Sequence, residues 1–303
     1  MELGFEGQLF ILAFDHRGSF RKKMFGIDGR QPSPEEQDRL ADAKRLVWEG
    51  FQAAAAAGLP QGAGVLVDEE MGADVAREAA AAGVPLAMPV EKSGQDVFDF
   101  EYGDAFGDHI ERFDPMFAKV LVRWNPEDDA ATKELQAGRL KRLGDWLHER
   151  NRKYLFELLV PATEEQLVSV GDVTAAYDAH LRPSLMIETI TELRSAGVEP
   201  DVWKIEGIDD RADCERVARL IRADGRDRVK AVVLGRGADT AKVDHWLRQG
   251  APVEGYAGFA IGRSIWWEGV AGFKDGAMSR AEAAASIASA YRRFVDVYLA
   301  AAG

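Results

Sequence analysis

The segment PDVWKIEG, residues 200–207, places a lysine in the middle of an apolar run. Lys204 lies between Trp203 and Ile205, and Glu206 follows two positions after the lysine. An amine that is held in a dry site beside another cation loses its proton more easily and becomes a nucleophile. A nucleophilic lysine attacks a carbonyl carbon to form a Schiff base. The non-catalytic interpretation is that Lys204 lies near a strand end and extends its charge into solvent.

Other charged residues also lie within or directly after apolar segments, and their spacing indicates which way they point. Successive side chains of a strand point to opposite faces. The large apolar residues of these segments alternate with the charged ones, so packing the apolar set on helices turns the charged set to the other face. The side chains predicted to face inward together are Lys204, Glu206, Glu157, Lys119, Arg123 and Asp15.

This inward set has the chemistry of a Schiff-base site. The protonated imine of a lysine withdraws electrons, which permits cleavage of the carbon–carbon bond beta to it, and Glu157 or Asp15 can move the protons that the reaction requires. Burying one charge alone costs several kcal/mol, so such groups must pair or change their pKa. Two structural interpretations stay open: Lys119 as a solvated residue at the N-terminal mouth of a barrel, and Glu157 as a partner of either lysine.

Two glycine–arginine pairs, GRG at 235–237 and GRS at 262–264, suggest a phosphate site. Gly235 and Gly262 would let backbone N–H groups approach a ligand, while Arg236 and Arg263 offer forked donors. The alternative is that either arginine pairs with a surface carboxylate. Further candidates for substrate binding at strand ends are Arg17 and Arg123.

Metal ions and cofactors are not expected. The five histidines (16, 109, 148, 180 and 245) are scattered and have no metal-binding spacing. Asp68, Glu69 and Glu70 could hold Mg²⁺, but an acidic run at a strand end is more often a solvated loop or the start of a helix. GRGAD is no dinucleotide fingerprint, and the sequence contains no P-loop.

The elements that must position these residues alternate along the chain. Apolar segments followed by helical patterns occur about eight times, which predicts an α/β protein, a (β/α)₈ barrel whose site lies at the C-terminal ends of the strands. A doubly wound open sheet is the structural alternative. No linker or low-complexity tract divides the chain, so we expect one domain over residues 1–303. The predicted strands are 9–14, 63–68, 85–90, 118–124, 153–160, 201–207, 229–235 and 256–262.

Composition limits the partners. The net charge of −13 disfavours binding to nucleic acid or anionic membranes, so a phosphorylated substrate needs a local cluster of arginine or lysine. One cysteine, Cys214, excludes a disulfide within the chain and suits a reducing cytoplasm. No signal peptide and no membrane-spanning run is evident. Acidic barrels of this size often self-associate, and the irregular region 91–115 is a candidate lid or interface.

Five motifs resemble a known family: ILAFDHRGSF, KVLVRWNPED, LFELLVPAT, PDVWKIEG and GFAIGRSIWWE. They look like the aldolase-like domain associated with the sugar kinase of myo-inositol catabolism, which is related to the class I tagatose-1,6-bisphosphate aldolases. The resemblance covers nearly the whole chain. It implies a (β/α)₈ barrel that cleaves a phosphorylated keto sugar through a Schiff base. The implied substrate is 2-deoxy-5-keto-gluconate 6-phosphate, with dihydroxyacetone phosphate and malonate semialdehyde as products.

The resemblance also implies roles for residues. Lys204 would form the imine, Glu157 would shuttle protons, Lys119 would be the assisting cation and Asp15 an active-site acid, with phosphate on Arg236 and Arg263. Where the tagatose-bisphosphate enzymes differ, this chain has RWNPEDD and DEEMGAD, so the far end of its substrate should differ too. Two alternatives remain: a sugar-phosphate isomerase or metal-assisted aldolase of another pathway (tagatose-bisphosphate-like or sulfosugar phosphate), and a non-catalytic sugar-phosphate-binding partner of a kinase.

Overall fold

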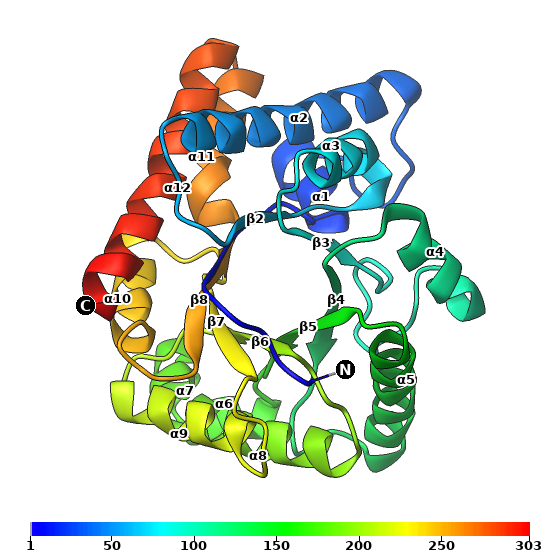
Figure 1. Cartoon of the computed structure of the whole chain (residues 1–303), viewed down its shortest axis with the longest axis vertical. Helices are drawn as coiled ribbons and strands as arrows, with labels where there is room; N and C mark the ends of the chain where they lie inside the picture. Colours follow the sequence, from blue (N-terminus) through cyan, green and yellow to red (C-terminus); the bar gives the residue numbers. More distant parts are fainter. Residues whose placement is uncertain (1) are drawn as a thin grey trace.

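Eight parallel strands pair in chain order and close on themselves, β1 with β8, in the computed structural model, which describes residues 2–303 (Figure 1). This closed order confirms the predicted (β/α)₈ barrel and excludes the open sheet. Each strand lies within one or two residues of its predicted range. The strands are β1 (Leu9–Ala13), β2 (Ala63–Leu66), β3 (Leu86–Pro89), β4 (Phe117–Arg123), β5 (Lys153–Leu159), β6 (Val202–Glu206), β7 (Lys230–Leu234) and β8 (Tyr256–Ile261).

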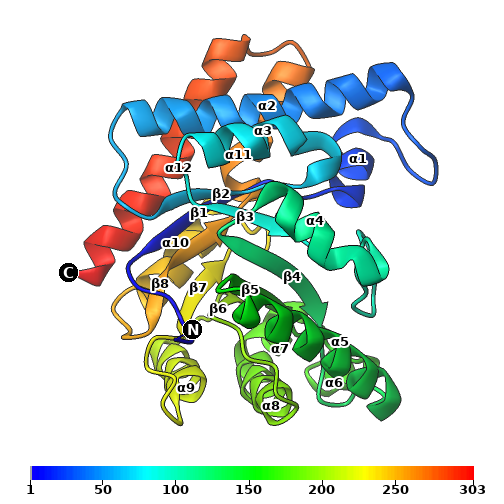
Figure 2. The same ribbon diagram turned by 45° about the vertical axis from the view of Figure 1, so that its right-hand side comes forward.

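The helices surround the barrel on its outside (Figures 1 and 2). The longest, α2 and α12, have 23 residues each and pack on one another beside β1 and β8. Each begins with a serine whose side chain and a following glutamate form a capping box. The helices are α1 (Gly18–Phe25), α2 (Pro34–Ala56), α3 (Glu69–Ala81), α4 (Phe106–Phe113), α5 (Ala130–Glu149), α6 (Glu164–Ser169), α7 (Thr174–His180), α8 (Arg182–Ser195), α9 (Arg211–Arg222), α10 (Thr240–Gly250), α11 (Arg263–Lys274) and α12 (Arg280–Ala302).

Strand alternation sorts the side chains as predicted. The outer set, which includes Phe156, Leu158, Trp203 and Ile205, belongs to the apolar layer between strands and helices. The inner set forms a second, smaller apolar cluster that fills the barrel below the polar residues: Leu9, Ile11, Ala13, Leu66, Ala87, Phe117, Leu155, Val202, Val232, Ala257 and Ala260. The polar inward residues therefore lie above a layer of apolar side chains inside the barrel.

Several short elements were not predicted. The segment 91–115 contains a 3₁₀ turn at Gly103–Ala105 and the helix α4, and α1, α6 and α7 also escaped prediction. These helices have six to eight residues, too few for a clear helical period, and tertiary packing stabilises them. In α4, Phe106 stacks on Phe100 at 4.4 Å between ring centroids.

No helix within residues 2–303 is both long and apolar enough to cross a membrane.

Asp68 and the two glutamates after it start a helix, which was the second of the two expectations for this acidic run. Asp68 is the N-cap of α3, and its Oδ1 accepts a hydrogen bond from Met71 N at 2.9 Å. Glu69 and Glu70 lie in the first helical turn, where the helix dipole favours negative charge. The acidic run therefore has a structural explanation.

Candidate active site

A cavity of about 590 Å³ opens at the C-terminal ends of the strands. Of the ten residues predicted for the site, nine line this cavity: Asp15, Arg17, Lys119, Arg123, Glu157, Lys204, Arg236, Gly262 and Arg263. The tenth, Gly235, does not. A Cβ on Gly235 would face Ile261 and Val243, so this glycine packs against the barrel wall, while Gly237 lines the cavity.

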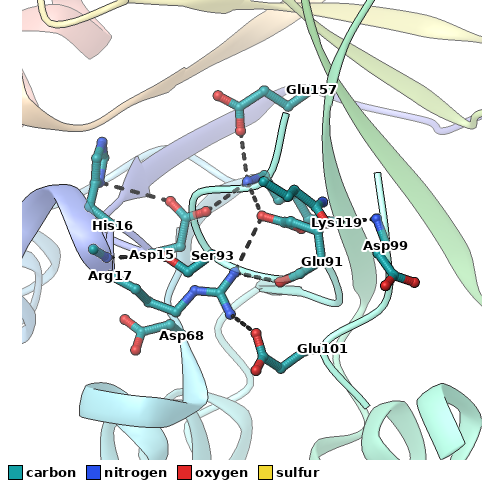
Figure 3. A network of polar contacts seen from close by, with 12 residues as sticks. Asp15, His16, Arg17, Asp68, Glu91, Ser93, Asp99, Glu101, Lys119 and Glu157 are labelled. Atoms are coloured by element: carbon teal, nitrogen blue, oxygen red, sulfur yellow. Dashed lines mark hydrogen bonds and ion pairs between the residues drawn. The ribbon is translucent and has the colours of Figure 1, made fainter. Parts of the chain in front are cut away.

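Lys119 is the centre of the polar network (Figure 3). Its Nζ lies 2.8 Å from Asp15 Oδ2, 2.9 Å from Glu91 Oε1 and 2.9 Å from Glu157 Oε2. The contacts with Asp15 and Glu91 are hydrogen bonds donated by Nζ, and the contact with Glu157 is an ion pair. Lys119 is 1% exposed, which contradicts the interpretation of it as a solvated residue at the N-terminal mouth.

Lys204 reaches the same carboxylate from the next strand. Its Nζ lies 2.9 Å from Glu157 Oε2, the oxygen that also contacts Lys119. The register explains this geometry, because Glu157 pairs with Leu121 on β4 and with Lys204 on β6. Lys204 is 2% exposed, so it does not extend its charge into solvent. The two amines are therefore joined by one carboxylate oxygen in a buried site.

The lysines control the ionisation of two carboxylates. Burial would raise the pKa of Asp15, but the charges of Lys119 and Lys204 outweigh burial and hold that pKa well below its ordinary value. Burial likewise opposes ionisation of Glu157, and the same two lysines lower its pKa. For Lys119, burial favours the neutral amine, yet Asp15, Glu157 and Glu91 raise its pKa well above the ordinary value. Lys119 is thus a permanent ammonium.

Glu91 is a member of this network that was not among the predicted site residues. It follows β3, is 5% exposed and lines the cavity. Burial raises its pKa, and Lys119 and Arg17 offset only part of that effect. Its Oε2 is buried and has no hydrogen-bond partner within residues 2–303. The only signal in the sequence was its place, one residue beyond a buried strand end, and many surface glutamates share that signal.

Arg17 holds the loop after β3. Its guanidinium donates to Glu91 O at 2.5 Å and to Glu101 Oε2 at 3.1 Å. Gly18 N also donates to Ser93 Oγ at 3.1 Å, so the start of α1 is joined to this loop at two points. Figure 3 shows Arg17 between Glu91 and Glu101. Arg17 is thus engaged by carboxylates, although it borders the cavity.

A third buried lysine supports the end of β1. Lys44 of α2 is 1% exposed and donates to Phe14 O, to His16 O at 2.8 Å and to Asp68 Oδ2 at 2.7 Å. These bonds hold the carbonyl groups on both sides of Asp15. Lys44 therefore fixes the backbone that presents Asp15 to Lys119, and its place in a long amphipathic helix gave no sign of this role.

The two glycine–arginine pairs follow β7 and β8, and they border the cavity there. Gly262 is the N-cap residue of α11 and supplies no side chain, so the helix N-terminus is open to a ligand. Arg263 Nη2 donates to Arg236 O at 2.8 Å, and burial lowers the pKa of Arg263. A Cβ on Gly237, where φ is +72°, would lie 2.7 Å from the Arg263 guanidinium carbon. The two motifs are therefore in close contact.

Arg236 pairs with carboxylates, but these are the half-buried Asp178 and the buried Glu206 of the cavity and not the surface carboxylate that one sequence interpretation expected. Its Nη1 lies 2.8 Å from both oxygens of Asp178, and its Nε lies 3.0 Å from Glu206 Oε1. Burial would lower the pKa of Arg236, but Glu206 and Asp178 raise it. Arg263, in contrast, has no carboxylate partner in the described part of the chain, so it is the freer of the two arginines for an anionic ligand.

The cavity is lined by more basic than acidic side chains, although the chain as a whole is acidic. Eight basic side chains line it (Arg17, Lys23, Lys92, Lys119, Arg123, Lys204, Arg236 and Arg263) against five acidic ones (Asp15, Glu91, Glu157, Asp178 and Glu206). A surplus of three positive charges in a chain of net charge −13 favours the binding of an anion in this cavity. Burial lowers the pKa of His16 to about 3, so this histidine adds no charge.

The arrangement has the parts that imine chemistry requires. It holds an amine on β6, a carboxylate at 2.9 Å that can accept its proton, and a fixed ammonium that stabilises negative charge. Within residues 2–303, no group of three or more histidine, cysteine, aspartate or glutamate side chains is arranged to hold a metal ion.

Comparison with known proteins identifies the family. The family model described as "Uncharacterized protein conserved in bacteria (DUF2090)" matches residues 5–302, and the chain belongs to this family. No curated protein is similar enough in sequence to match the chain.

Solved aldolase structures share the fold. A fructose-bisphosphate aldolase from Plasmodium falciparum, in complex with TRAP and an inhibitor, superposes with a TM-score of 0.68 at 13% identity, over 97% of this chain and 91% of the other. A Schiff base-forming fructose-1,6-bisphosphate aldolase has a TM-score of 0.57 at 15% identity, over 96% and 94%. An archaeal fructose-1,6-bisphosphate aldolase whose catalytic lysine carries a carbinolamine has 0.58 at 16%, over 96% and 94%. At such identities the likeness is one of fold.

Proposed function

We propose that this member of the DUF2090 family is a Schiff-base (class I) aldolase that cleaves a phosphorylated keto sugar or keto-sugar acid. The observation that carries the proposal is the position of Glu157 Oε2, which lies 2.9 Å from the amines of both Lys204 and Lys119 in a buried cavity. Three carboxylates surround Lys119, whereas Lys204 contacts one. We therefore assign the attack on the carbonyl carbon to Lys204, the amine with fewer counter-charges.

Imine formation uses the Lys204–Glu157 pair. Lys204 passes a proton to Glu157 and attacks the substrate carbonyl carbon with its free electron pair, and a second proton moves from the attacking nitrogen to the carbonyl oxygen to give the carbinolamine. The carbinolamine then loses water, with Glu157 returning its proton to the departing hydroxyl group. Lys119 remains an ammonium and favours the ionised form of Glu157, the form that accepts the proton of Lys204 and that is restored when water leaves.

Cleavage needs a second base for the substrate hydroxyl group. Asp15, whose pKa the lysines hold low, accepts the proton of the hydroxyl group beta to the imine carbon. The carbon–carbon bond breaks, its electron pair moves toward the iminium nitrogen to form an enamine, and an aldehyde leaves. Protonation of the enamine carbon and addition of water to the imine then release the ketone and free Lys204.

The substrate proposed is 2-deoxy-5-keto-gluconate 6-phosphate, which would give dihydroxyacetone phosphate and malonate semialdehyde. The resemblance of five strand-end motifs to the aldolase-like domain of inositol catabolism supports this choice. The positive surplus in the cavity and the uncapped start of α11 beside Arg263 support a phosphate group at β7 and β8. The fold shared with Schiff-base aldolases is consistent with the reaction class.

Reductive trapping tests the proposal. The protein is incubated with dihydroxyacetone phosphate, reduced with borohydride and analysed by peptide mass spectrometry. A stable adduct on Lys204, absent in Lys204→Ala, is the expected result, with Lys119 unmodified because its amine stays protonated. If Lys204 carries no adduct, the proposal is wrong.

Two further outcomes would point to other functions. Activity that EDTA abolishes but Lys204→Ala retains would indicate a metal-assisted aldolase or isomerase. Thermal stabilisation by sugar phosphates without turnover, and with little effect of Glu157→Gln on binding, would indicate a non-catalytic binding protein.

A further inference from the structure

Two half-buried arginines of the cavity wall, Arg123 and Arg263, form no ion pair with any carboxylate in residues 2–303. The other basic residues of the wall contact a carboxylate, except the exposed Lys23. Removing a guanidinium partly from water without a counter-charge is unfavourable. Each of these two arginines is therefore suited to an anionic group of a ligand.

The two arginines lie on opposite walls of the barrel. Arg123 ends β4 and Arg263 begins α11, directly after β8. In a closed barrel of eight strands in chain order, β4 and β8 are four strands apart, with β6 halfway between them (Figure 1). Lys204 is on β6. A ligand whose carbonyl group meets Lys204 can thus present one end to each arginine.

The surroundings of the two arginines differ. Arg263 lies at the open N-terminus of α11, where backbone N–H groups add donors for the several oxygens of a phosphate. Arg123 has apolar neighbours on one side, because its register neighbour is Leu159 and Leu121 precedes it on the same face of β4, and it contacts the loop of Gln95.

The guanidinium of Arg123 is held in place and keeps free donors. Its Nη1 donates to Gln95 O at 2.5 Å, and Arg123 O accepts a hydrogen bond from Gln136 Nε2 at 3.3 Å. One of its five side-chain N–H groups is thus used within residues 2–303. The guanidinium of Arg123, held by Gln95 O beside Leu121 and Leu159, can donate two parallel hydrogen bonds to a planar carboxylate.

We propose that Arg123 binds a carboxylate at the end of the substrate farthest from the phosphate, so that the substrate is a keto acid phosphate with an anionic group at each end. This inference rests on the proposed function, because it takes Lys204 as the residue that binds the carbonyl group. In this proposal, Arg123 determines whether the enzyme prefers a keto-sugar acid or an uncharged keto sugar as its substrate.

Two half-substrate probes separate the two ends. One probe is 3-hydroxypropionate, a three-carbon acid without phosphate, whose binding is measured by calorimetry and by ligand-observed NMR. The other is dihydroxyacetone phosphate, trapped on Lys204 with borohydride. Arg123→Met should weaken 3-hydroxypropionate binding by about tenfold or more, since a charged hydrogen-bond pair is lost. Arg123→Lys should recover part of the affinity, because it keeps the charge but not the fork.

The opposite variant should show the opposite pattern. Arg263→Met should reduce trapping of dihydroxyacetone phosphate and leave 3-hydroxypropionate binding within about twofold of the wild type. Arg219→Met, on the exposed face of α9, controls for the loss of one positive charge and should change neither probe.

Specific outcomes would overturn the inference. It is wrong if Arg123→Met and Arg123→Lys both bind 3-hydroxypropionate as the wild type does, or if inorganic phosphate competes with 3-hydroxypropionate in Arg263→Met, which would indicate a second phosphate site. Failure of the proposed function has a different signature: no adduct on Lys204 in the wild type, whatever the result with 3-hydroxypropionate.

Discussion

Lys119 and Lys204 meet at a single atom, Glu157 Oε2, which lies 2.9 Å from each amine. The remaining contacts of the two lysines are unequal. Lys119 also donates hydrogen bonds to Asp15 and Glu91, whereas Lys204 pairs with no carboxylate other than Glu157 in residues 2–303. The shared oxygen thus lies between an amine with three carboxylate neighbours and an amine with one, and the proposed mechanism gives the two lysines different tasks for this reason.

Glu157→Gln should slow the formation of the Schiff base while preserving the fold. The amide has the shape of the carboxylate but cannot accept the proton of Lys204, so the rate of borohydride-dependent labelling should fall about 10²- to 10⁴-fold. Asp244→Asn is a matched control, because Asp244 is also buried and pairs with Arg293 at 2.9 Å outside the cavity. Labelling at the wild-type rate in Glu157→Gln would remove Glu157 from the mechanism.

Glu91 should make the protein less stable as the pH rises. Burial raises the pKa of Glu91 from its ordinary value of 4.5, so the folded state holds this proton more tightly than the unfolded state does. The contribution of this group is therefore most favourable below pH 4.5 and is lost as the pH rises from there through the folded-state pKa.

Glu91→Gln removes this titration. The free energy of unfolding, measured by urea denaturation between pH 4.5 and 8, should fall less with rising pH in Glu91→Gln than in the wild type. Parallel pH profiles for the two proteins would contradict the raised pKa. Because Glu91 contacts Lys119, the pH profile of labelling at Lys204 should change as well.

Lys44→Met should destabilise the protein strongly although Lys44 is far from the substrate. The substitution leaves Asp68 as an unpaired buried charge, which costs about 3–5 kcal/mol of the free energy of unfolding. Lys44→Met/Asp68→Asn should recover part of this loss, because asparagine is neutral and still caps α3. Lys141→Met, which breaks an exposed pair with Asp145, should cost about 0.5 kcal/mol or less.

Gly237→Ala tests the phosphate end of the cavity. Both Gly237 and Gly276 have φ of +72°, so alanine at either position costs about 1–2 kcal/mol from the left-handed backbone. Only at Gly237 does the new Cβ displace a side chain, the guanidinium of Arg263, because nothing lies within 4 Å at Gly276. Trapping of dihydroxyacetone phosphate should therefore weaken in Gly237→Ala but not in Gly276→Ala; equal trapping would contradict a ligand role for Arg263.

The eight strands, the α/β barrel and the direction of the charged residues could all be predicted from the amino-acid sequence. Period-two alternation is a local property, so the apolar Trp203 and Ile205 were sufficient to turn Lys204 inward. The same local logic turned Glu157 and Lys119 to the same side.

How these groups pair could be seen only in the three-dimensional structure. Asp15 and Lys119 are 104 residues apart, and no local pattern measures the distance between their atoms. For the same reason, the sequence did not predict the contact of Glu91 with Lys119 or the ion pair of Arg236 with Asp178. It also did not predict that Lys44 binds the carbonyl groups at the end of β1. The charge state of a buried group depends on the groups that it contacts. The proposed choice of Lys204 over Lys119 as the nucleophile therefore required the three-dimensional arrangement.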